Sequence, residues 1–254
     1  MRSQNLKGII YRIYSSGQSD KVIYVIDTDG SKNTLLAKGV KKSTSKKSHS
    51  IELCNLVQAK VLEGYNLPLI TEIKTIDEFN LWKTNDIGIL LIQLFCEVID
   101  KLCYENNKDK NLYNIFLDTL NHFDQNILLL ANAFMLKAIW HTGSIAEVSI
   151  NALNGSALNP NNIYFSRQVA GYISKSDLAR NIELTGEPVD AKIAKSQKFI
   201  LENPINKIIK LNLTFEELYK MLQIELDWFE IITEQRLKSK GIILSLVNKL
   251  HKAL

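Results

Sequence analysis

A cluster of lysines near the start of the chain is the group of residues best suited to binding chemistry. Residues 32–47 hold six lysines and no aspartate or glutamate, and most of them lie in the segment LLAKGVKKSTSKKSHS at 35–50. Folding does not require such a cluster, because like charges repel one another. Lysines suit point contacts to phosphates, whereas bidentate reading of bases favours arginine. We therefore predict a polyanion-binding site with little sequence preference.

The residues expected to contact this polyanion lie in the cluster and on the strands beside it. Aromatic rings are interleaved with the basic residues, and such rings serve as stacking platforms for bases. Tyr11 and Tyr24 fall in the apolar register and are expected in the core, so Tyr14 and Tyr65 are the better stacking candidates. The predicted contact set is Lys38, Lys41, Lys42, Lys46, Lys47, Arg12, Lys21 and Tyr14.

The charge of the chain is unevenly placed. Residues 1–50 hold ten Lys and Arg against three Asp and Glu, whereas the remaining residues hold 21 against 24. A basic segment on an otherwise slightly acidic chain indicates a polyanion partner for that segment. We therefore assign binding to the N-terminal part.

Signals of catalysis and of metal binding are absent from the sequence. There is no GxxxxGK[ST], GxGxxG, HExxH or GxSxG pattern. The four histidines are scattered, and the three cysteines include no CxxC pair. Cys96 and Cys103 are seven residues apart, as expected of buried thiols on one helical face. We predict that the protein is not an enzyme and uses no metal or cofactor.

Residues 6–75 read as strands. Alternating apolar residues occur in GIIYRIY (8–14) and KVIYVID (21–27), and further strand patterns follow at 52–64 and 67–75. The residues expected on one face are Ile9, Tyr11 and Ile13 in the first strand, and Val22, Tyr24 and Ile26 in the second. Five short strands with turns between them predict a small closed barrel of the oligonucleotide-binding (OB) type, because closure removes sheet edges.

The apolar period changes to that of helices from about residue 84. Helices are expected at about 84–105, 111–123 and 126–141, and short links between them favour a bundle. Thr214 and Glu217 form a capping box that opens another helix, expected to run to about residue 238. Residues 142–190 are rich in Asn, Ser and Gly and read as a loop-rich insertion. The prediction is an α+β protein with an OB domain at 1–80 and a helical domain at 81–254.

Neither a leader nor a membrane span is expected. The start MRSQNLKGIIYR lacks a continuous apolar region. The most apolar stretch, IGILLIQLFCEVI, contains Gln93 and Glu97 and is shorter than the roughly 18 residues that a membrane span needs. We expect a cytoplasmic protein with no membrane partner.

Several of these segments resemble the bacterial recombination mediator RecO. The family opens with a strand, a turn like GxSDK and an LAKG segment followed by basic residues, here LKGIIYRIYSSGQSDKVIYVIDTDG and LLAKGVKKSTSKKSHSIEL. The stretches YNLPLITE (65–72) and LDWFEIITEQRLKSKGIIL (226–244) also match, the latter as the family's last long helix closing on an LKS-basic signature. Weak similarity runs through the chain in the family's order.

The resemblance implies a function in DNA repair and recombination. RecO proteins bind single- and double-stranded DNA and anneal complementary strands. They act with RecR and with the C-terminal tail of single-strand-binding protein, and indirectly with the recombinase RecA, which they help to load. The resemblance also implies nucleoid association, and it places Lys41, Lys42, Lys46 and Lys47 where the family's DNA-contacting basic residues lie.

A zinc site of many RecO members has no matching ligands here. The frame YFSRQVAGYISKSD is kept, but the four ligand positions hold Asn151, Asn154, Ser174 and Asp177. These residues include no thiol and do not suit tetrahedral zinc, so the insertion is expected to be held by packing alone.

Two alternatives come from other classes of protein. A basic barrel loop also suits an RNA-binding module in translation or ribosome assembly, and competition between matched DNA and RNA oligonucleotides separates that reading from a DNA mediator. The second is an interaction scaffold whose lysines only solubilise it. An enzyme is the least supported reading.

Overall fold

The structure is a computed structural model, and it describes residues 3–64, 66–123, 126–143, 148–159 and 161–252. By its internal contacts the chain divides into two compact units. Unit 1 comprises residues 1–84 and 96–121, and unit 2 comprises residues 85–95 and 122–254.

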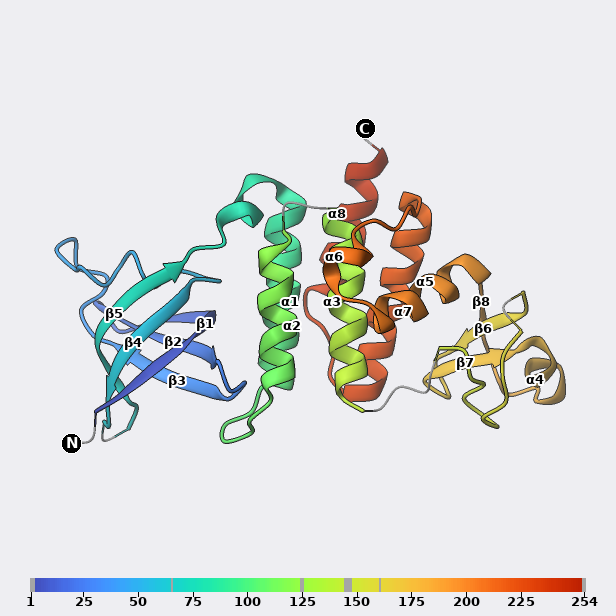
Figure 1. The fold of residues 1–254 in the computed structure, drawn as a ribbon, viewed down its shortest axis with the longest axis horizontal. Coiled ribbons are helices and arrows are strands. Elements are labelled where there is room, and N and C mark those ends of the chain that lie inside the picture. Colours follow the sequence, from blue (N-terminus) through green and yellow to red (C-terminus); the bar gives the residue numbers. More distant parts are fainter. Residues whose placement is uncertain (1–2, 65, 124–125, 144–147, 160, 253–254) are drawn as a thin grey trace. The chain divides into compact units, whose positions relative to one another are not determined.

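Unit 1 contains a five-stranded barrel (Figure 1). Its strands are β1 (Ser3–Ser16), β2 (Asp20–Asp27), β3 (Lys32–Ala37), β4 (Leu56–Leu62) and β5 (Leu69–Asp77). They are ordered β1-β2-β3-β5-β4, and the ring closes because β1 pairs antiparallel with both β2 and β4. The contact between β3 and β5 is parallel, at Leu36 and Leu69. This is the expected OB-type barrel.

The barrel interior is filled from all five strands and from the segment between β3 and β4. The buried apolar residues of this interior are Leu6, Ile10, Ile23, Val25, Leu35, Ala37, Val40, Ile51, Val57, Ala59, Val61 and Ile70. Burial of the leucine, isoleucine and valine side chains among them, each worth about 1.5–3 kcal/mol when complete, is the main force that holds the barrel.

Val22, Tyr24 and Ile26 share one face of β2, as predicted, but Tyr24, expected in the core, does not belong to the barrel interior. Ile23 and Val25 belong to the interior cluster, and successive strand residues point to opposite sides. The predicted trio Val22, Tyr24 and Ile26 therefore lies on the outer side, where Tyr24 is half-buried and Ile26 is buried.

The face predicted to be shared by Ile9, Tyr11 and Ile13 is wrong, because β1 contains a bulge. The register with β2 shifts between Ile10 and Arg12. As a result Ile10 and Ile13, three residues apart, both contact the barrel interior. Tyr11, expected in the core, is buried as predicted, at 1% exposure.

Residues 96–109 cover part of the outer side of the barrel. The Cys103 thiol donates to the Gly30 carbonyl at 3.4 Å, and the backbone N–H of Lys32 donates to the Tyr104 carbonyl at 3.1 Å. The Cys96 sulfur lies 4.0 Å from that of Cys54. Cys96 and Cys103 are buried free thiols, as predicted, and Cys54 is one as well. Burial raises the pKa of Cys103 to about 12. Ile9, Tyr11 and Ile26 thus belong to a second buried surface, outside the barrel interior.

The remaining helices of unit 1 are short or follow this covering segment. A 3-10 turn, η1 (Asn80–Thr84), follows β5, and α1 (Asp86–Leu102) belongs to both units. Helix α2 (Lys110–Asn121) buries Leu112, Tyr113 and Phe116. The expected helices at 84–105 and 111–123 are confirmed within a few residues.

Unit 2 is built around α3 (Ile127–His141), which is buried on nearly all sides. Such an all-round apolar helix is typical of the centre of a bundle. Its buried Asn132 donates to the carbonyl of Leu218 at 3.1 Å, which links α3 to α7 (Phe215–Thr233). The other bundle helices are α5 (Ala191–Glu202), α6 (Ile205–Ile208) and α8 (Lys240–Lys252).

Helix α7 begins as predicted but ends earlier than predicted. The Glu217 N–H donates to the Thr214 hydroxyl at 3.2 Å, and the Thr214 N–H donates to the Glu217 carboxylate at 2.7 Å. The helix ends at Thr233, because Glu234 takes a left-handed backbone with φ of 54°. The LKSK signature therefore links two helices instead of closing one.

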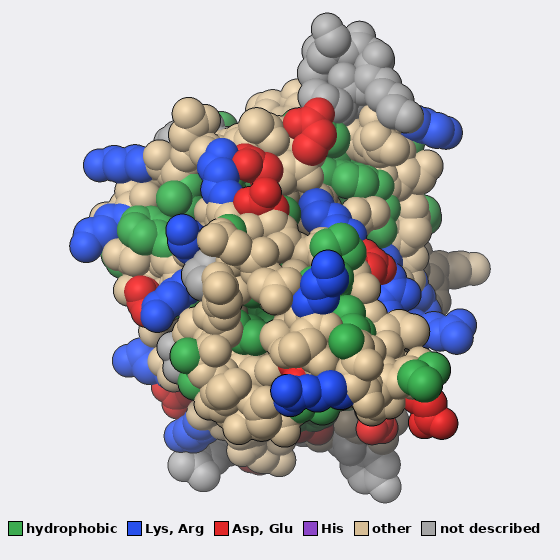
Figure 2. Space-filling view, turned by 90° about the vertical axis from the view of Figure 1, so that its right-hand side faces the viewer, with side chains coloured by type: hydrophobic (Ala, Val, Ile, Leu, Met, Phe, Trp, Pro, Cys, Tyr) green, Lys and Arg blue, Asp and Glu red, His purple; other side chains and the backbone are tan. Residues whose placement is uncertain are grey.

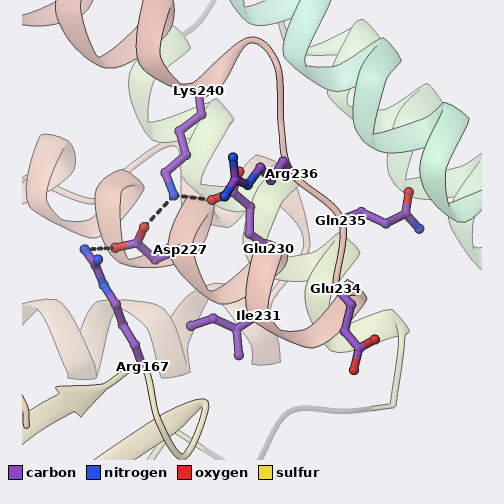
Figure 3. Close-up of a pocket in the computed structure, with 8 residues that line it drawn as sticks. All are labelled: Arg167, Asp227, Glu230, Ile231, Glu234, Gln235, Arg236 and Lys240. Carbon is purple, nitrogen blue, oxygen red and sulfur yellow. Dashed lines mark hydrogen bonds and ion pairs between the residues drawn. The ribbon is translucent and has the colours of Figure 1, made fainter.

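Ion pairs fix this connection (Figure 3). The Lys240 ammonium lies 2.5 Å from both Asp227 and Glu230. Arg167 reaches the same Asp227 carboxylate at 2.6 Å. Figure 3 shows these side chains converging. They line an open hollow of about 370 Å³, where most charges are already paired.

The insertion, expected to be loop-rich, also contains a small sheet. Strands β6 (Ile163–Ser166), β7 (Gly171–Ser174) and β8 (Glu187–Val189) lie in the order β7-β6-β8, and α4 (Lys175–Arg180) follows β7. On the face that Figure 2 shows, the described basic and acidic side chains are interspersed. No described helix is long and apolar enough to cross a membrane.

Gly30 is required where the covering segment meets the barrel. Its φ is 87°, and an added Cβ would lie 1.9 Å from the Asp109 carbonyl oxygen. We expect Gly30→Ala to lower the free energy of unfolding by more than about 3 kcal/mol, because conformational strain and a backbone clash add together.

Gly17→Ala is the matched control. Gly17 also has a positive φ, of 61°, but an added Cβ there meets nothing within 4 Å. The Gly17→Ala substitution should lower the free energy of unfolding by only about 1–2 kcal/mol. Denaturant unfolding measures both variants, and equal losses would contradict the close approach of Asp109 to Gly30.

Candidate nucleic-acid interface

The lysine loop, residues 38–50, is anchored to the turn between β1 and β2. The Gly39 N–H donates to the Asp20 carboxylate at 2.8 Å, and the Lys41 N–H donates to the Ser19 carbonyl at 2.9 Å. The Lys41 ammonium also donates to the Gly17 carbonyl at 3.1 Å. The GQSD turn and the LAKG segment, far apart in the sequence, thus form one hydrogen-bonded unit.

The Asp20 carboxylate is stabilised in its charged form by this arrangement. The Gly39 N–H, the Ser19 hydroxyl and the nearby Lys38 and Lys42 together lower its pKa. One carboxylate therefore both orders the start of the lysine loop and offsets part of the repulsion among its lysines.

The rest of the lysine loop is a series of tight turns. The Ser45 N–H donates to the Lys42 carbonyl at 2.9 Å, and the Ile51 N–H donates to the Ser48 carbonyl at 3.2 Å. Val40 and Ile51, which flank the basic stretch, are buried in the barrel interior. Lys41, Lys42 and Lys46 between these two anchors are exposed, on a stretch of backbone that is held in the core at both ends.

The lysines of the loop line an open hollow of about 440 Å³, which we call the loop hollow. Its lining residues are Lys38, Gly39, Lys42, Thr44, Ser45, Lys46, Lys47, Thr71, Glu72 and Ile73. Lys38, Lys42 and Lys46 are exposed, whereas Lys47 is half-buried and donates to the Ile70 carbonyl at 3.1 Å. The structure therefore brings four of the predicted lysines together, with Lys41 held at the neighbouring turn.

Arg12 and Tyr14 lie in a separate cluster on the outer side of β1 and β2. The Arg12 guanidinium pairs with Asp100 and stacks 4.5 Å above the centre of the Tyr14 ring. Tyr14 is 41% exposed and meets Tyr24 edge-on. Lys32 also pairs with Asp100, at 3.4 Å. Both cations in this cluster are thus already close to a carboxylate.

The remaining predicted residues fall elsewhere. Lys21 is half-buried on β2, opposite Ser15 of β1 and Ala37 of β3. Tyr65 lies outside the described residues. Sequence reasoning missed Asp20 as the anchor of the loop, although an aspartate directly before a strand and beside a glycine turn is a common backbone-binding position.

A comparison with known proteins decides the family. The model of the family described as recombination protein O, C terminal, matches residues 88–241, more than half of the 254 residues. The chain belongs to the RecO family. It is 26% identical to the DNA repair protein RecO of Dehalococcoides mccartyi strain BAV1 over 218 residues, covering 85% of each chain. It is 27% identical to that of Clostridium novyi over 226 residues, again covering 85% of each.

Three of the four positions that the resemblance matches to zinc ligands form a hydrogen-bonded cluster. The Asp177 carboxylate accepts from the Asn151 amide at 2.7 Å and from the Ser174 hydroxyl at 2.5 Å. Asn154 instead accepts from Ser156. Three of the four positions thus lie together, but their donor set does not fit zinc, and the Asp177 oxygen is engaged by Asn151 and Ser174. Among the described residues, no group of three or more His, Cys, Asp and Glu is placed to hold a metal ion.

An aromatic cluster joins the insertion of this RecO protein to α7. Trp228 is fully buried, and its ring lies 5.5 Å from those of Phe165 and Tyr172. The Trp228 indole N–H donates to the Ala170 carbonyl at 2.8 Å. These contacts hold the insertion by packing.

A buried carboxyl group, Glu225, lies beside this cluster. Gln197 donates to Glu225 at 3.3 Å, and Tyr172 donates its hydroxyl to Gln197. The second Glu225 oxygen has no hydrogen-bond partner among the described residues. Burial raises the pKa of Glu225 well above its ordinary value.

Removing the Asp20 carboxylate should loosen the lysine loop. In Asp20→Ala the Gly39 N–H loses its acceptor, so its hydrogen exchange should accelerate, and trypsin should cleave sooner after Lys41 and Lys42. Wild type should show the same loosening at acid pH, because a lowered folded-state pKa means that the anchor is lost as pH falls through that pKa. Unchanged exchange at Gly39 would contradict the anchoring role.

Glu225→Gln should become more stabilising as pH rises. Because the folded-state pKa is raised, the folded state binds more protons, and wild-type stability falls as pH rises above about 4.3. The difference between variant and wild type should grow by up to about 1.4 kcal/mol per pH unit until the folded-state pKa is passed. Denaturant unfolding at several pH values measures it, with the exposed Glu202→Gln as control. A difference that does not change with pH would contradict a protonated buried Glu225.

Proposed function

We propose that this RecO family member is a DNA-binding recombination mediator that works in DNA repair and holds DNA through its lysine loop. The observation that carries the proposal is the loop hollow, in which Lys38, Lys42, Lys46 and Lys47 line one open surface. The names of its relatives, DNA repair proteins RecO, support the same role.

The chemistry of the loop fits phosphate binding by charge neutralisation. Lysine ammonium groups displace condensed counterions from the nucleic-acid backbone, so that affinity falls with salt. If about five phosphates are engaged, raising salt from about 50 to 200 mM lowers affinity roughly 10²–10³-fold. Fixing the loop at Asp20, Val40 and Ile51 means that little backbone entropy is lost on binding.

Strand annealing follows from the same surface without an active site. Two single strands held on neutralising lysines repel one another less, and base pairing then supplies the driving force. Tyr14 beneath Arg12 offers a partly exposed ring on which a base can stack. The protein acts in this proposal as a mediator and not as an enzyme, with single- and double-stranded DNA as its ligands.

The family role extends the proposal to protein partners. We propose that the chain works with RecR, with the C-terminal tail of single-strand-binding protein and, through them, with RecA, in the nucleoid of the cytoplasm. These partners rest on family membership alone.

The test compares salt dependence in two triple variants. Fluorescence anisotropy of a labelled single-stranded DNA across a salt series should give a steep slope for wild type. Lys38→Gln, Lys42→Gln and Lys46→Gln together should reduce the slope by about 2 and leave folding intact, since these ammonium groups are exposed. The matched control replaces the exposed Lys195, Lys207 and Lys210 of unit 2 by glutamine.

Equal salt slopes of DNA binding for the two triple variants would contradict the lysine-loop proposal. A matched RNA competitor in the same assay addresses the RNA-binding alternative, and displacement of the labelled DNA by RNA at lower concentration than by DNA would favour that alternative.

A further inference from the structure

The face that OB folds generally offer to nucleic acid is partly covered in this protein. Oligonucleotides usually cross strands 2 and 3 of an OB barrel. Here the start of β3 is occupied, because the Lys32 N–H donates to the Tyr104 carbonyl at 3.1 Å and the Thr34 hydroxyl contacts Glu105 at 3.5 Å. Asp100 also places a negative charge beside Arg12 on this face. A strand that leaves the lysine loop therefore meets an occupied and partly neutralised surface in that direction.

A second hollow offers an open surface in another direction. It has a volume of about 500 Å³ on the outer side of the barrel, and we call it the β4–β5 hollow. Its lining residues are Asn5, Gln58, Ala59, Lys60, Glu72, Ile73 and Lys74. Glu72 and Ile73 line the loop hollow as well, so the two hollows adjoin along β5.

A β-bulge lies where the two hollows meet. Lys60 pairs with Glu72 and Val61 pairs with Ile70, so Thr71 is an extra residue on β5. The Thr71 hydroxyl donates to the Lys60 carbonyl at 3.0 Å. Bulges bend a strand and occur often beside functional sites. The lysine loop contacts the strand beside this bulge, because the Lys47 ammonium donates to the Ile70 carbonyl.

The charge of the joined surface suits a polyanion. Among its described lining residues, six are lysines, and Glu72 is the acid. Lys60 lies 3.8 Å from Glu72, but the two side chains are 49% and 75% exposed. An exposed pair of this kind is worth at most about 1 kcal/mol, so Lys60 remains available to a phosphate. Asn5 and Gln58 add amide groups that can bind phosphate or sugar oxygens.

We propose that a single strand of nucleic acid runs from the loop hollow across the Thr71 bulge into the β4–β5 hollow, where Lys60 and Lys74 contact its phosphates. This path rests on the proposed function and specifies its route. It differs from the usual OB path over strands 2 and 3. Because every cation on it is a lysine, the contacts are independent of base sequence.

The first test removes the two lysines of the distal hollow. Lys60→Gln with Lys74→Gln should reduce the salt slope of single-stranded DNA binding by about 1.4, while the matched control, Lys195→Gln with Lys207→Gln, should leave it unchanged. Across a series of oligothymidylates, wild-type affinity should keep rising beyond the length at which the distal variant reaches its plateau. Equal plateau lengths and slopes for the distal variant and the control would overturn the path.

The second test uses the opposite sign of charge. On the proposed path Glu72 repels the strand, so Glu72→Gln should tighten binding on the order of severalfold at low salt, about as much as losing one lysine weakens it. Unchanged or weaker binding by Glu72→Gln would also overturn the path.

The failure of the path and the failure of the proposed function are distinguishable. If the Lys38, Lys42 and Lys46 variant loses binding while the distal variant and Glu72→Gln do not change it, the path is wrong and the lysine loop still binds DNA. If the loop variant also equals its control, both proposals fail.

Discussion

Asp100 lowers the positive charge on one side of the barrel. This one carboxylate binds both Arg12 and Lys32, and it lies in the segment 96–109 that covers the outer side of β1 and the start of β3. On that side Arg12 and Lys32 lie beside the Asp100 carboxylate, and the Lys32 N–H is already hydrogen-bonded to Tyr104. The lysines that remain accessible to a ligand lie in the lysine loop and on β4 and β5.

A second carboxylate, Asp20, orders the lysine loop. Its bond to the Gly39 N–H fixes the start of the loop, and the buried Val40 and Ile51 fix its ends. An ordered set of lysines binds phosphates with less loss of entropy than a flexible tail. The insertion is fixed by different means, since Trp228, Phe165 and Tyr172 pack together. The hydrogen-bonded cluster at Asn151, Ser174 and Asp177 adds a polar link.

Most elements of this fold could be predicted from the sequence, but the faces of the first strands could not. Strand patterns identified β1, β2, β4 and β5, and the Thr214–Glu217 capping box identified the start of α7. Alternation in β2 identified the shared face of Val22, Tyr24 and Ile26 but not the side on which it lies, because Ile26 on the outer side is as fully buried as Ile23 and Val25 on the interior side. A bulge shifted β1, and the left-handed Glu234 broke a helix whose apolar pattern continues. The lysines of the candidate site could be recognised in the sequence as a run of positive charge. The roles of Asp20, Asp100 and the Thr71 bulge could not, because they arise from contacts between residues distant in sequence.

The most direct measurement of where DNA lies is lysine protection in the intact protein. Acetylation of exposed lysines, followed by mass spectrometry with and without single-stranded DNA, reports each ammonium group separately. The account predicts protection of Lys42, Lys46, Lys60 and Lys74, with Lys195 and Lys207 modified equally in both states. Protection at Lys195 and Lys207 with none at the first four would contradict it, because DNA would then lie on the helical unit and not on the barrel.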